Sequence, residues 1–339
     1  MRTKGPLVSV LMPFRNAAST VEEALDSIRN QTLDDFELLA VDDGSQDHSA
    51  RLVERMAQAD PRIRLLKPGK LGLVRALNLG IQEAKSDTIA RMDADDLMHP
   101  QRLEIQWAYL LGHPETALVA SQVEMFPEEA ISDGYREYLR WQNGCLEDGQ
   151  IKANVYVESP FVHPSVMVRK RALEEVGGYR EGDFPEDYEL WLRMCHAGAR
   201  MAKVPMVLLR WREHPDRASR RDPRYSREAF DRLRADYLSR EKRLRGGRDV
   251  VFWGAGRRSR QRAKLLMDKG IRPSAWIDID PEKIGKKIWE IPVYGPQWLD
   301  REAKPVVLIY VRTHGAREQI QETLESMGYS IGLDFLPVG

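Results

Sequence analysis

The fold is decided by residues 7–47, which read LVSVLMPFRNAASTVEEALDSIRNQTLDDFELLAVDDGSQD. An apolar run of strand length at residues 7–12 is followed by an amphipathic stretch and then by a second apolar run at residues 36–41. Ser19 and Glu22 have the spacing of a capping box, which predicts that a helix begins there. Strands that alternate with helices are typical of parallel sheets with crossover connections.

The same alternation continues outward from this stretch. Residues 127–160 have mixed polar and aromatic content and no clear period, and we leave them as a variable region without assigned elements. The other strands that we predict in the first two-thirds of the chain are residues 63–66, 88–92, 165–168 and 204–211. The helices that we predict there begin near Asp47, Leu73, Lys170 and Pro185.

A second α/β alternation begins after Gly246 and Gly247, with strands at 249–253, 275–277 and 306–311. Because 339 residues exceed one ordinary core, two domains are expected. We therefore predict a larger α/β domain at residues 1–220, a basic connecting helix at 221–247 and a smaller α/β domain at 248–339.

The overall charge is balanced, because 52 lysine and arginine residues match 52 aspartate and glutamate residues. This balance argues against nucleic acid as a partner. The two cysteines, Cys145 and Cys195, have no metal-ligand spacing, and the start of the chain lacks the apolar run of a signal peptide. No segment reaches the ~20 apolar residues of a membrane-spanning helix. We therefore expect a cytoplasmic protein.

Residues 216–248 are rich in arginine, with apolar residues at helical spacing between 228 and 244. Two interpretations stay open. The arginines can form a solvated face on a helix packed between domains, which we favour. They can also bind the anionic inner face of a membrane, as basic amphipathic helices do.

Three carboxylates follow a predicted strand directly in RMDADDLMHP, residues 91–100. Side chains two apart on an extended chain point to the same side, so Asp93 and Asp95 should project together from the strand's carboxyl end. Open α/β sheets bind ligands at that end. Carboxylates without cysteine suit Mg²⁺ or Mn²⁺, which bind one or two carboxylates together with substrate phosphates. The spacing is equally compatible with a solvated turn.

A second acidic turn, VDDGSQD at residues 41–47, follows another strand of the same series. Gly44 and Ser45 predict a tight turn that holds carboxylates over the same edge of the sheet. Asp43 can accept hydrogen bonds from a base or a ribose. Asp43 and Asp47 can instead cap the next helix, and we favour that role for Asp47.

Taken in order, the opening stretch, VDDGSQD, GLVRALNLGI at residues 72–81 and RMDADD resemble the family 2 glycosyltransferases over about residues 7–215. The resemblance implies the glycosyltransferase A-type fold, a nucleotide diphosphate sugar donor and a divalent cofactor, Mn²⁺ or Mg²⁺. It implies that Asp95 binds the metal and that Asp93 binds the ribose or the metal. The positions that correspond to the family's nucleotide-binding residues are Pro13, Arg15, Asp43, Arg75, Asn78 and Asp93. Leu77 stands where many relatives carry an arginine.

Transfer to a hydroxyl needs a general base, because a protonated hydroxyl is a poor nucleophile. In GDFPEDYELWLRM, residues 182–194, Pro185 fits the first position of a helix and puts Glu186 and Asp187 in its first turn. The helix dipole favours acids there whatever their function. The segment also resembles the family's Glu-Asp motif, which implies Asp187 as the base, Glu186 as the residue that orients or binds the acceptor, and inversion at the anomeric carbon.

Two histidines, His163 and His214, lie where family members often contact the diphosphate or the metal. A lone histidine is more often structural, and we assign only His214 to the metal site. We predict that Trp191 and Trp211 belong to the core rather than to a sugar platform.

The second domain opens with VVFWGAGRRSRQRAKLL, residues 250–266. Gly254 and Gly256 lie between a predicted strand and helix, Ser259 replaces the third glycine of a dinucleotide fingerprint, and Asp278 ends the next strand. The pattern resembles the small Rossmann-like domains of sugar-modifying enzymes and implies a second nucleotide site at Gly254, Gly256 and Asp278. A glycine turn that serves packing alone stays open, and no hydride transfer is expected.

We therefore predict a metal-assisted, inverting hexosyltransferase that moves a sugar, from UDP in the first instance, to a glycan or other hydroxyl acceptor in cell-surface polysaccharide biosynthesis. A sugar nucleotidyltransferase would carry a glycine in the loop after the first strand, and MPFRNAAS has none. A non-catalytic sugar-nucleotide-binding protein would bind without turnover. The sequence does not identify the sugar, the acceptor or the oligomeric state.

Overall fold

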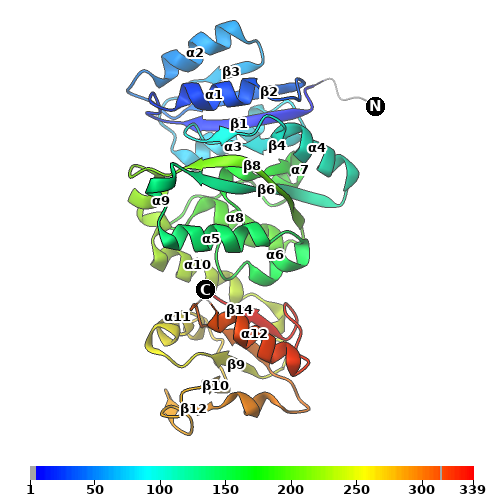
Figure 1. Cartoon of the computed structure of the whole chain (residues 1–339), viewed down its shortest axis with the longest axis vertical. Helices are drawn as coiled ribbons and strands as arrows, with labels where there is room; N and C mark the ends of the chain where they lie inside the picture. Colours follow the sequence, from blue (N-terminus) through cyan, green and yellow to red (C-terminus); the bar gives the residue numbers. More distant parts are fainter. Residues whose placement is uncertain (1–4, 314) are drawn as a thin grey trace. The chain divides into compact units, whose positions relative to one another are not determined.

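The structure is a computed structural model that describes residues 5–313 and 315–339 and divides into two compact units (Figure 1). Unit 1 runs to residue 148 and adds residues 160–182 and 186–221. Unit 2 consists of residues 149–159, 183–185 and 222–339. No sequence pattern predicted that two short segments, residues 149–159 and 183–185, would join the carboxyl-terminal unit. The proposed boundaries at 220 and 248 stay predictions.

Unit 1 is built on an eight-stranded sheet with the order β3-β2-β1-β4-β7-β6-β8-β5. Its first half is parallel and consists of β1 (Val8–Phe14), β2 (Phe36–Asp42), β3 (Ile63–Leu66) and β4 (Thr88–Arg91). Its second half is mixed and consists of β5 (Leu97–Met98), β6 (Thr116–Phe126), β7 (Met167–Arg169) and β8 (Arg200–Arg212). The expected parallel pairing is confirmed for β1 to β4, whereas β7 runs antiparallel to β4 and to β6.

The helices of unit 1 cover this sheet. They are α1 (Val21–Arg29), α2 (Ser49–Ala59), α3 (Leu73–Glu83), α4 (Arg102–Gly112), α5 (Asp133–Gly144), α7 (Lys170–Glu175), α8 (Glu186–His196) and α9 (Ala218–Arg221), with short turns η1 (Glu128–Ala130) and η2 (His163–Ser165). The predicted capping box is wrong, because α1 begins at Val21 after Thr20 and no side chain caps it. Residues 127–160, left without assigned elements in the sequence analysis, hold α5 and also α6 (Asp148–Asn154), which spans the boundary of the units.

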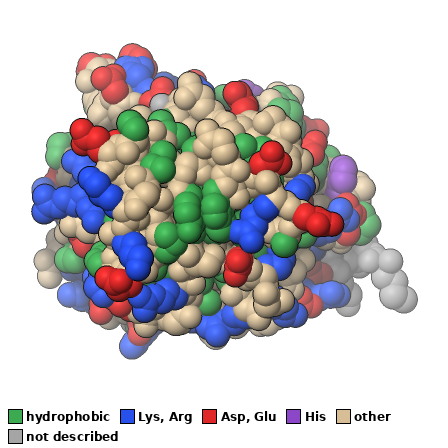
Figure 2. Space-filling model, turned by 90° about the horizontal axis from the view of Figure 1, so that it is seen from below, with side chains coloured by type: hydrophobic (Ala, Val, Ile, Leu, Met, Phe, Trp, Pro, Cys, Tyr) green, Lys and Arg blue, Asp and Glu red, His purple; other side chains and the backbone are tan. Residues whose placement is uncertain are grey.

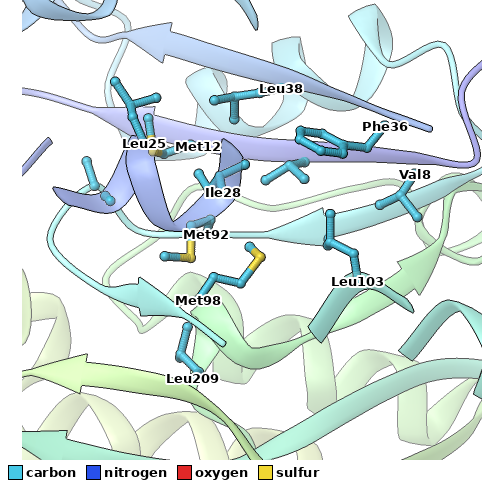
Figure 3. Close-up of a cluster of buried hydrophobic side chains, with 14 of the residues drawn as sticks. Val8, Met12, Leu25, Ile28, Phe36, Leu38, Met92, Met98, Leu103 and Leu209 are labelled. Atoms are coloured by element: carbon cyan, nitrogen blue, oxygen red, sulfur yellow. The ribbon is translucent and has the colours of Figure 1, made fainter. Parts of the chain in front are cut away.

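The core of unit 1 packs α1 against the sheet (Figure 3). Leu25 and Ile28 lie on the buried face of α1, because residues three and four apart share one side of a helix. Every residue of β1 and of β2 is buried, as expected for central parallel strands covered on both faces. Met92 and Met98 belong to the same core and flank the acidic turn at residues 93–96. Apolar packing thus anchors that turn on both sides.

Unit 2 contains a six-stranded sheet with the order β11-β12-β10-β9-β13-β14. Its strands are β9 (Val250–Trp253), β10 (Ala275–Ile277), β11 (Lys287–Ile288), β12 (Ile291–Tyr294), β13 (Val306–Ile309) and β14 (Phe335–Pro337), and they pair in parallel except for β11 with β12. Its helices are α10 (Arg227–Leu238), α11 (Arg257–Met267) and α12 (Ala316–Ser326), with short turns η3 (Pro223–Tyr225), η4 (Lys242–Leu244) and η5 (Pro296–Leu299). The chain is therefore α/β throughout, as predicted.

Many arginines of the 216–248 segment pair with carboxylates close to them in sequence. The pairs include Arg221 with Asp216, Arg224 with Asp222, Arg240 with Asp236 and Arg243 with Glu241. The face drawn in Figure 2 carries both basic and acidic side chains. This pairing supports the solvated interpretation, and contact with a membrane surface stays a prediction. Each helix among the described residues is too short or too polar to cross a bilayer.

Candidate active site

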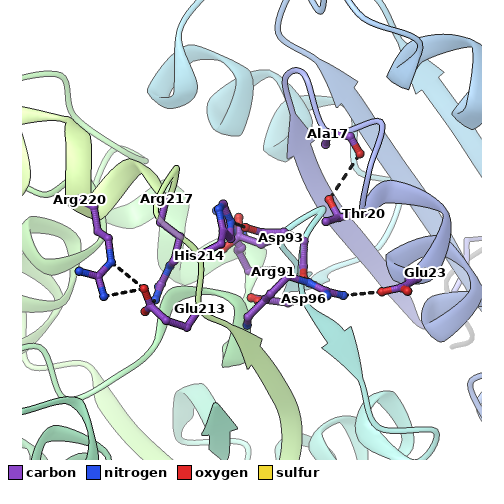
Figure 4. Close-up of polar contacts among 12 residues, drawn as sticks. Ala17, Thr20, Glu23, Arg91, Asp93, Asp96, Glu213, His214, Arg217 and Arg220 are labelled. Atoms are coloured by element: carbon purple, nitrogen blue, oxygen red, sulfur yellow. Dashed lines mark hydrogen bonds and ion pairs between the residues drawn. The ribbon is translucent and has the colours of Figure 1, made fainter. Parts of the chain in front are cut away.

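The acidic turn that follows β4 brings three carboxylates together (Figure 4). Asp93, Asp95 and Asp96 each offer an oxygen, and these oxygens lie within 4.8 Å of one another. Asp93 and Asp95 are half-buried, whereas Asp96 is only 1% exposed. Among the described residues, the Oδ2 atom of Asp96 has no hydrogen-bond partner although it is buried. The structure thus adds Asp96 to the pair that the spacing predicted.

The end of β8 holds this turn in place. The backbone N–H of Arg212 donates to Oδ1 of Asp96 at 2.7 Å, and its Nε donates to the carbonyl oxygen of Asp95 at 2.6 Å. The Arg212 guanidinium also pairs with Glu23 of α1. Two residues further on, Nε2 of His214 lies 2.8 Å from Oδ2 of Asp95. The structure therefore joins His214 to the acidic turn, although 119 residues separate it from Asp95 in sequence.

Burial and mutual repulsion disturb the ionisation of all three acids. Burial raises the pKa of Asp93, and it raises the pKa of Asp96 well above its usual range, with further repulsion from Asp95. Burial also raises the pKa of Asp95, but the hydrogen bond and charge of His214 outweigh that effect, and the pKa is lowered overall. Asp93 and Asp96 thus disfavour their own negative charge, which a bound cation would stabilise.

Two arginines that sequence analysis did not select face the acids. Arg91, 4% exposed, pairs with Asp93, and this charge raises the pKa of Arg91 although burial lowers it. Arg217 donates to the buried Glu213 at 2.9 Å, and its guanidinium carbon lies 3.9 Å from the ring centroid of Trp211. The spacing of two between Arg91 and Asp93 on an extended strand was an available signal. No sequence signal indicated Arg217, because its place near the acidic turn depends on where β8 ends.

The proposed base lies in the first turn of α8. Burial raises the pKa of Asp187 to about 7, and repulsion from Glu186 adds to this, whereas the charge of Arg91 acts in the opposite direction. Oδ1 of Asp187 accepts the N–H of Tyr188 at 2.7 Å. Glu186 is 1% exposed. The helix begins at Glu186, so Pro185 precedes the first helical residue instead of occupying it as predicted.

His163 packs beside this helix start. Its Nε2 lies 2.7 Å from the hydroxyl of Tyr179, and its Nδ1 lies 3.9 Å from a Glu186 oxygen. Burial lowers the pKa of His163 well below its usual range, and Arg91 contributes in the same direction. Trp191, fully buried, contacts the His163 ring at a centroid distance of 5.9 Å. His163 is therefore a neutral interior residue, and Trp191 belongs to the core as predicted, whereas Trp211 is half-buried.

The residues predicted to bind the nucleotide lie along the first half of the sheet. Pro13 is buried in β1, and Arg15 is exposed just beyond it. Oδ1 of Asp43 accepts the N–H groups of Leu71 and Gly72, at 2.6 and 2.7 Å, just before α3. Asp47 accepts the N–H of Ser49, the first residue of α2, at 3.0 Å, but the N-cap residue of this helix is His48 and not Asp47 as favoured.

Arg75 and Asn78 are both engaged with the segment that leads to α8. Arg75 pairs with Glu181 at 3.0 Å on the surface. The Asn78 amide exchanges two hydrogen bonds of 2.9 Å with the backbone of Tyr179. These contacts connect α3 to the approach to α8. The nucleotide-binding roles of both residues stay predictions.

In unit 2 the predicted nucleotide residues already have structural partners. Gly254 has a φ of 112°, and a Cβ there would lie 3.0 Å from Val311 and 3.2 Å from Ser259. Oδ2 of Asp278 accepts the N–H of Ala255 at 2.8 Å, and Oδ1 accepts that of Asp280 at 3.0 Å. Gly256 directly precedes α11. These contacts favour the packing interpretation of the glycine turn, and a second nucleotide site there stays a prediction.

Residues 9–177 match the family model described as glycosyl transferase family 2. In sequence, the chain is similar to the amylovoran biosynthesis glycosyltransferase AmsE of Erwinia amylovora, at 32% identity over 218 residues that cover 63% of this chain and 79% of AmsE. In structure, it is similar to S. aureus TarS 1-349 in complex with UDP-GlcNAc, with a TM-score of 0.54, 15% identity, and coverage of 69% of this chain and 72% of that one. It is also similar to the mannosyltransferase PcManGT from Pyrobaculum calidifontis in complex with GDP-Man and Mn²⁺, with a TM-score of 0.50, 22% identity, and coverage of 79% and 70%.

A mixed sheet with an acidic turn after its central strand β4, together with these likenesses, shows that unit 1 has the glycosyltransferase A-type fold. The chain belongs to glycosyltransferase family 2, which confirms the family predicted from its motifs. The matched residues end at 177, so Asp187 and His214 lie beyond them. The roles predicted for these two residues stay predictions.

Proposed function

We propose that the chain transfers a sugar from a nucleotide diphosphate donor to a hydroxyl acceptor, with inversion and with Asp187 as the general base. One observation carries this proposal: the acidic turn and the start of α8 meet at one buried guanidinium. Arg91 pairs with Asp93, and its charge also acts on Asp187. A base and an acidic turn around one cation suit a reaction in which a hydroxyl loses a proton while a diphosphate leaves.

The residues of the acidic turn fit a divalent cation, for which Mn²⁺ and Mg²⁺ are our candidates. The fit rests on three oxygens within 4.8 Å, on the buried Asp96 oxygen without a hydrogen-bond partner among the described residues, and on the adjacent His214. Asp95 and His214 would hold the ion together with Asp93 or Asp96. When bound, such an ion supplies positive charge that stabilises a leaving diphosphate.

Asp187 is suited to accept the proton of the acceptor hydroxyl. With a pKa of about 7, it is largely ionised under mildly alkaline conditions and remains a stronger base than an ordinary aspartate. Glu186 supports this role, because its negative charge opposes the ionisation of its neighbour. An attacking hydroxyl on one side of the anomeric carbon and a diphosphate on the other give a single displacement, and a single displacement inverts configuration.

Structural neighbours guide the choice of donor. TarS was solved with UDP-GlcNAc and PcManGT with GDP-Man and Mn²⁺, so a nucleotide diphosphate sugar is the class to test, with UDP first. AmsE acts in amylovoran biosynthesis, which supports a growing cell-surface polysaccharide as the acceptor class. A panel of UDP-, GDP- and dTDP-sugars, scored by metal-dependent thermal stabilisation and then by turnover, would identify the donor. Turnover also separates an enzyme from a protein that only binds.

The decisive variant is Asp187→Asn, which removes the base while keeping the shape of the side chain. Loss of a general base costs about 10² to 10⁴-fold in rate, so transfer should fall to near background while binding of the nucleotide persists. Glu175→Gln, which removes an exposed carboxylate on α7, is the matched control and should retain activity. A fully active Asp187→Asn variant would refute the assignment of the base.

A further inference from the structure

Unit 2 contains a cluster of arginines that the glycosyl transfer described above does not use. The arginine cluster consists of four residues from three elements: Arg227 and Arg234 of α10, Arg262 of α11, and Arg312, which follows β13. Arg234 is buried, Arg262 is half-buried and Arg227 is exposed. Its members therefore lie at different depths.

Hydrogen bonds and ion pairs bring these side chains together. Arg262 donates to the carbonyl oxygen of Tyr310 at 2.7 Å, close to the end of β13. Arg234 donates to the carbonyl oxygen of Val157, and the guanidinium of Arg312 lies 3.7 Å from the carboxylate of the next residue, Glu158. Arg234 and Arg312 thus converge on one short segment of backbone.

Positive charge exceeds negative charge in this cluster. Among the described residues, the side-chain carboxylates near these arginines include Asp231, which pairs with Arg234, and Glu158, which faces Arg312 over a distance longer than a hydrogen bond, and Gly339 also packs against the Arg234 guanidinium. Burial lowers the pKa of Arg262 to about 10, and the charge of Arg312 contributes. Burial also lowers the pKa of Arg312, with a contribution from Arg234. Like charges held together in a partly buried place are unfavourable unless an anion accompanies them.

The position of the cluster also suits a ligand. Tyr310 directly follows β13, and the turn from Gly254 to Gly256 directly follows the neighbouring strand β9, so both lie at the carboxyl edge of a parallel sheet. Open α/β sheets bind ligands at this edge. Among the described residues, the buried Nη1 of Arg262 has no hydrogen-bond partner. A polar group left unpaired beside an excess of positive charge indicates a missing anion.

We propose that the arginine cluster binds the phosphate of a phosphorylated ligand, with Arg262 and Arg312 as the residues that contact it. A guanidinium presents a planar fork of N–H donors that matches phosphate oxygens in pairs. Arg312 is the accessible member, because 41% of its side chain is exposed and its pair with Glu158 spans 3.7 Å. The site needs neither a metal ion nor the carboxylate of Asp278, and it does not depend on the function proposed for unit 1.

The full-length protein can be tested with inorganic pyrophosphate by isothermal titration calorimetry at low ionic strength in EDTA. The chelator removes any cation that would attract an anion to the acidic turn of unit 1. We expect pyrophosphate to bind the unmodified chain and to bind Arg312→Ala about tenfold more weakly or worse, because a charge-assisted hydrogen bond is lost. Arg272→Ala is the matched control, since Arg272 is an exposed arginine before β10, at the opposite edge of the sheet.

The outcomes separate the proposal from general electrostatic attraction. Equal weakening by Arg272→Ala and Arg312→Ala, or no binding of any phosphorylated probe in EDTA, would overturn it. Circular dichroism checks that Arg312→Ala is folded, and Arg312→Lys, which keeps the charge but loses the fork, should bind with intermediate strength. UDP and vesicles that contain phosphatidic acid serve as further probes. Binding of UDP that Arg312→Ala weakens identifies a soluble ligand, whereas vesicle binding weakened by the same change identifies a lipid phosphate.

Discussion

The carboxyl edges of the two sheets carry side chains of opposite charge. In unit 1 the carboxyl end of β4 leads into three aspartates whose oxygens crowd within 4.8 Å. In unit 2 the carboxyl end of β13 leads to arginines that outnumber the carboxylates facing them. Both edges belong to α/β sheets, where ligands characteristically bind. The same architecture is thus compatible with a cation at one edge and an anion at the other.

Asp278 and Asp96 differ in how fully their carboxylate oxygens are hydrogen-bonded within the protein. Asp278 of unit 2 has backbone N–H partners on both carboxylate oxygens. Asp96 of unit 1 has one oxygen bonded to Arg212 and one with no partner among the described residues. A buried polar atom without a partner costs free energy, so its presence points to a ligand rather than to the fold. Position at a strand end therefore does not distinguish these two aspartates, whereas their hydrogen bonds do.

The strongest test of this contrast is Asp95→Ala. We expect metal-dependent transfer to fall by about 10³-fold or more, because the substitution removes the carboxylate paired with His214 and a proposed ligand of the ion. Initial rates across a Mn²⁺ titration would measure the loss. Asp278→Ala is the matched variant at the other edge and should keep its rate per folded molecule. If Asp95→Ala kept both its rate and its need for metal, the acidic turn would not be the metal site.

Much of unit 1 could be predicted, because local pattern determines it. The strand β3 was predicted at residues 63–66 and is found there, and α3 begins at Leu73, where its start was predicted. The geometry of the acidic turn also followed from spacing, since Asp93 and Asp95 are neighbours in sequence. The family was evident from motifs that lie in order within residues 7–96. Short-range periodicity and short motifs were sufficient for these features.

The parts that could not be predicted depend on contacts distant in sequence. Nothing local shows that β7 runs antiparallel to β4, or that the end of β8 returns to Asp95 and Asp96. The pairing of Arg234 with the backbone of Val157 spans 77 residues and likewise has no sequence signal. The capping box predicted at Ser19 and Glu22 is wrong although it depends on local sequence alone. A match of two residue types at one spacing is a weak signal, which tertiary packing readily overrides.

A smaller effect is expected at the edge of unit 2. Asp278→Ala should lower the free energy of unfolding by about 1–3 kcal/mol, because the N–H of Ala255, bonded to a buried carboxylate, loses its acceptor. Urea denaturation monitored by tryptophan fluorescence is suitable, since Trp253 and Trp276 lie in this sheet. Asp280→Ala, which removes a more exposed neighbour, should have a smaller effect. A loss of transfer activity at unchanged stability would instead assign Asp278 to a functional site.

The smallest effect concerns the ionisation of Asp187, and its direction is fixed by the groups around it. Since the base acts as a carboxylate and its pKa is about 7, kcat/KM should rise with pH through about 7 and level off above it. Glu186 raises this pKa by repulsion and Arg91 lowers it, while burial is the largest cause.

Glu186→Gln removes the repulsion and leaves Arg91 in place, so ionisation becomes easier and the midpoint should move to lower pH, by about one unit or less. Rates measured between about pH 5 and 9 at saturating metal would reveal the shift even if Glu186→Gln also lowers the plateau. A midpoint that stays fixed or moves upward would mean that another group titrates, and Asp187 would then lose its assignment as the base.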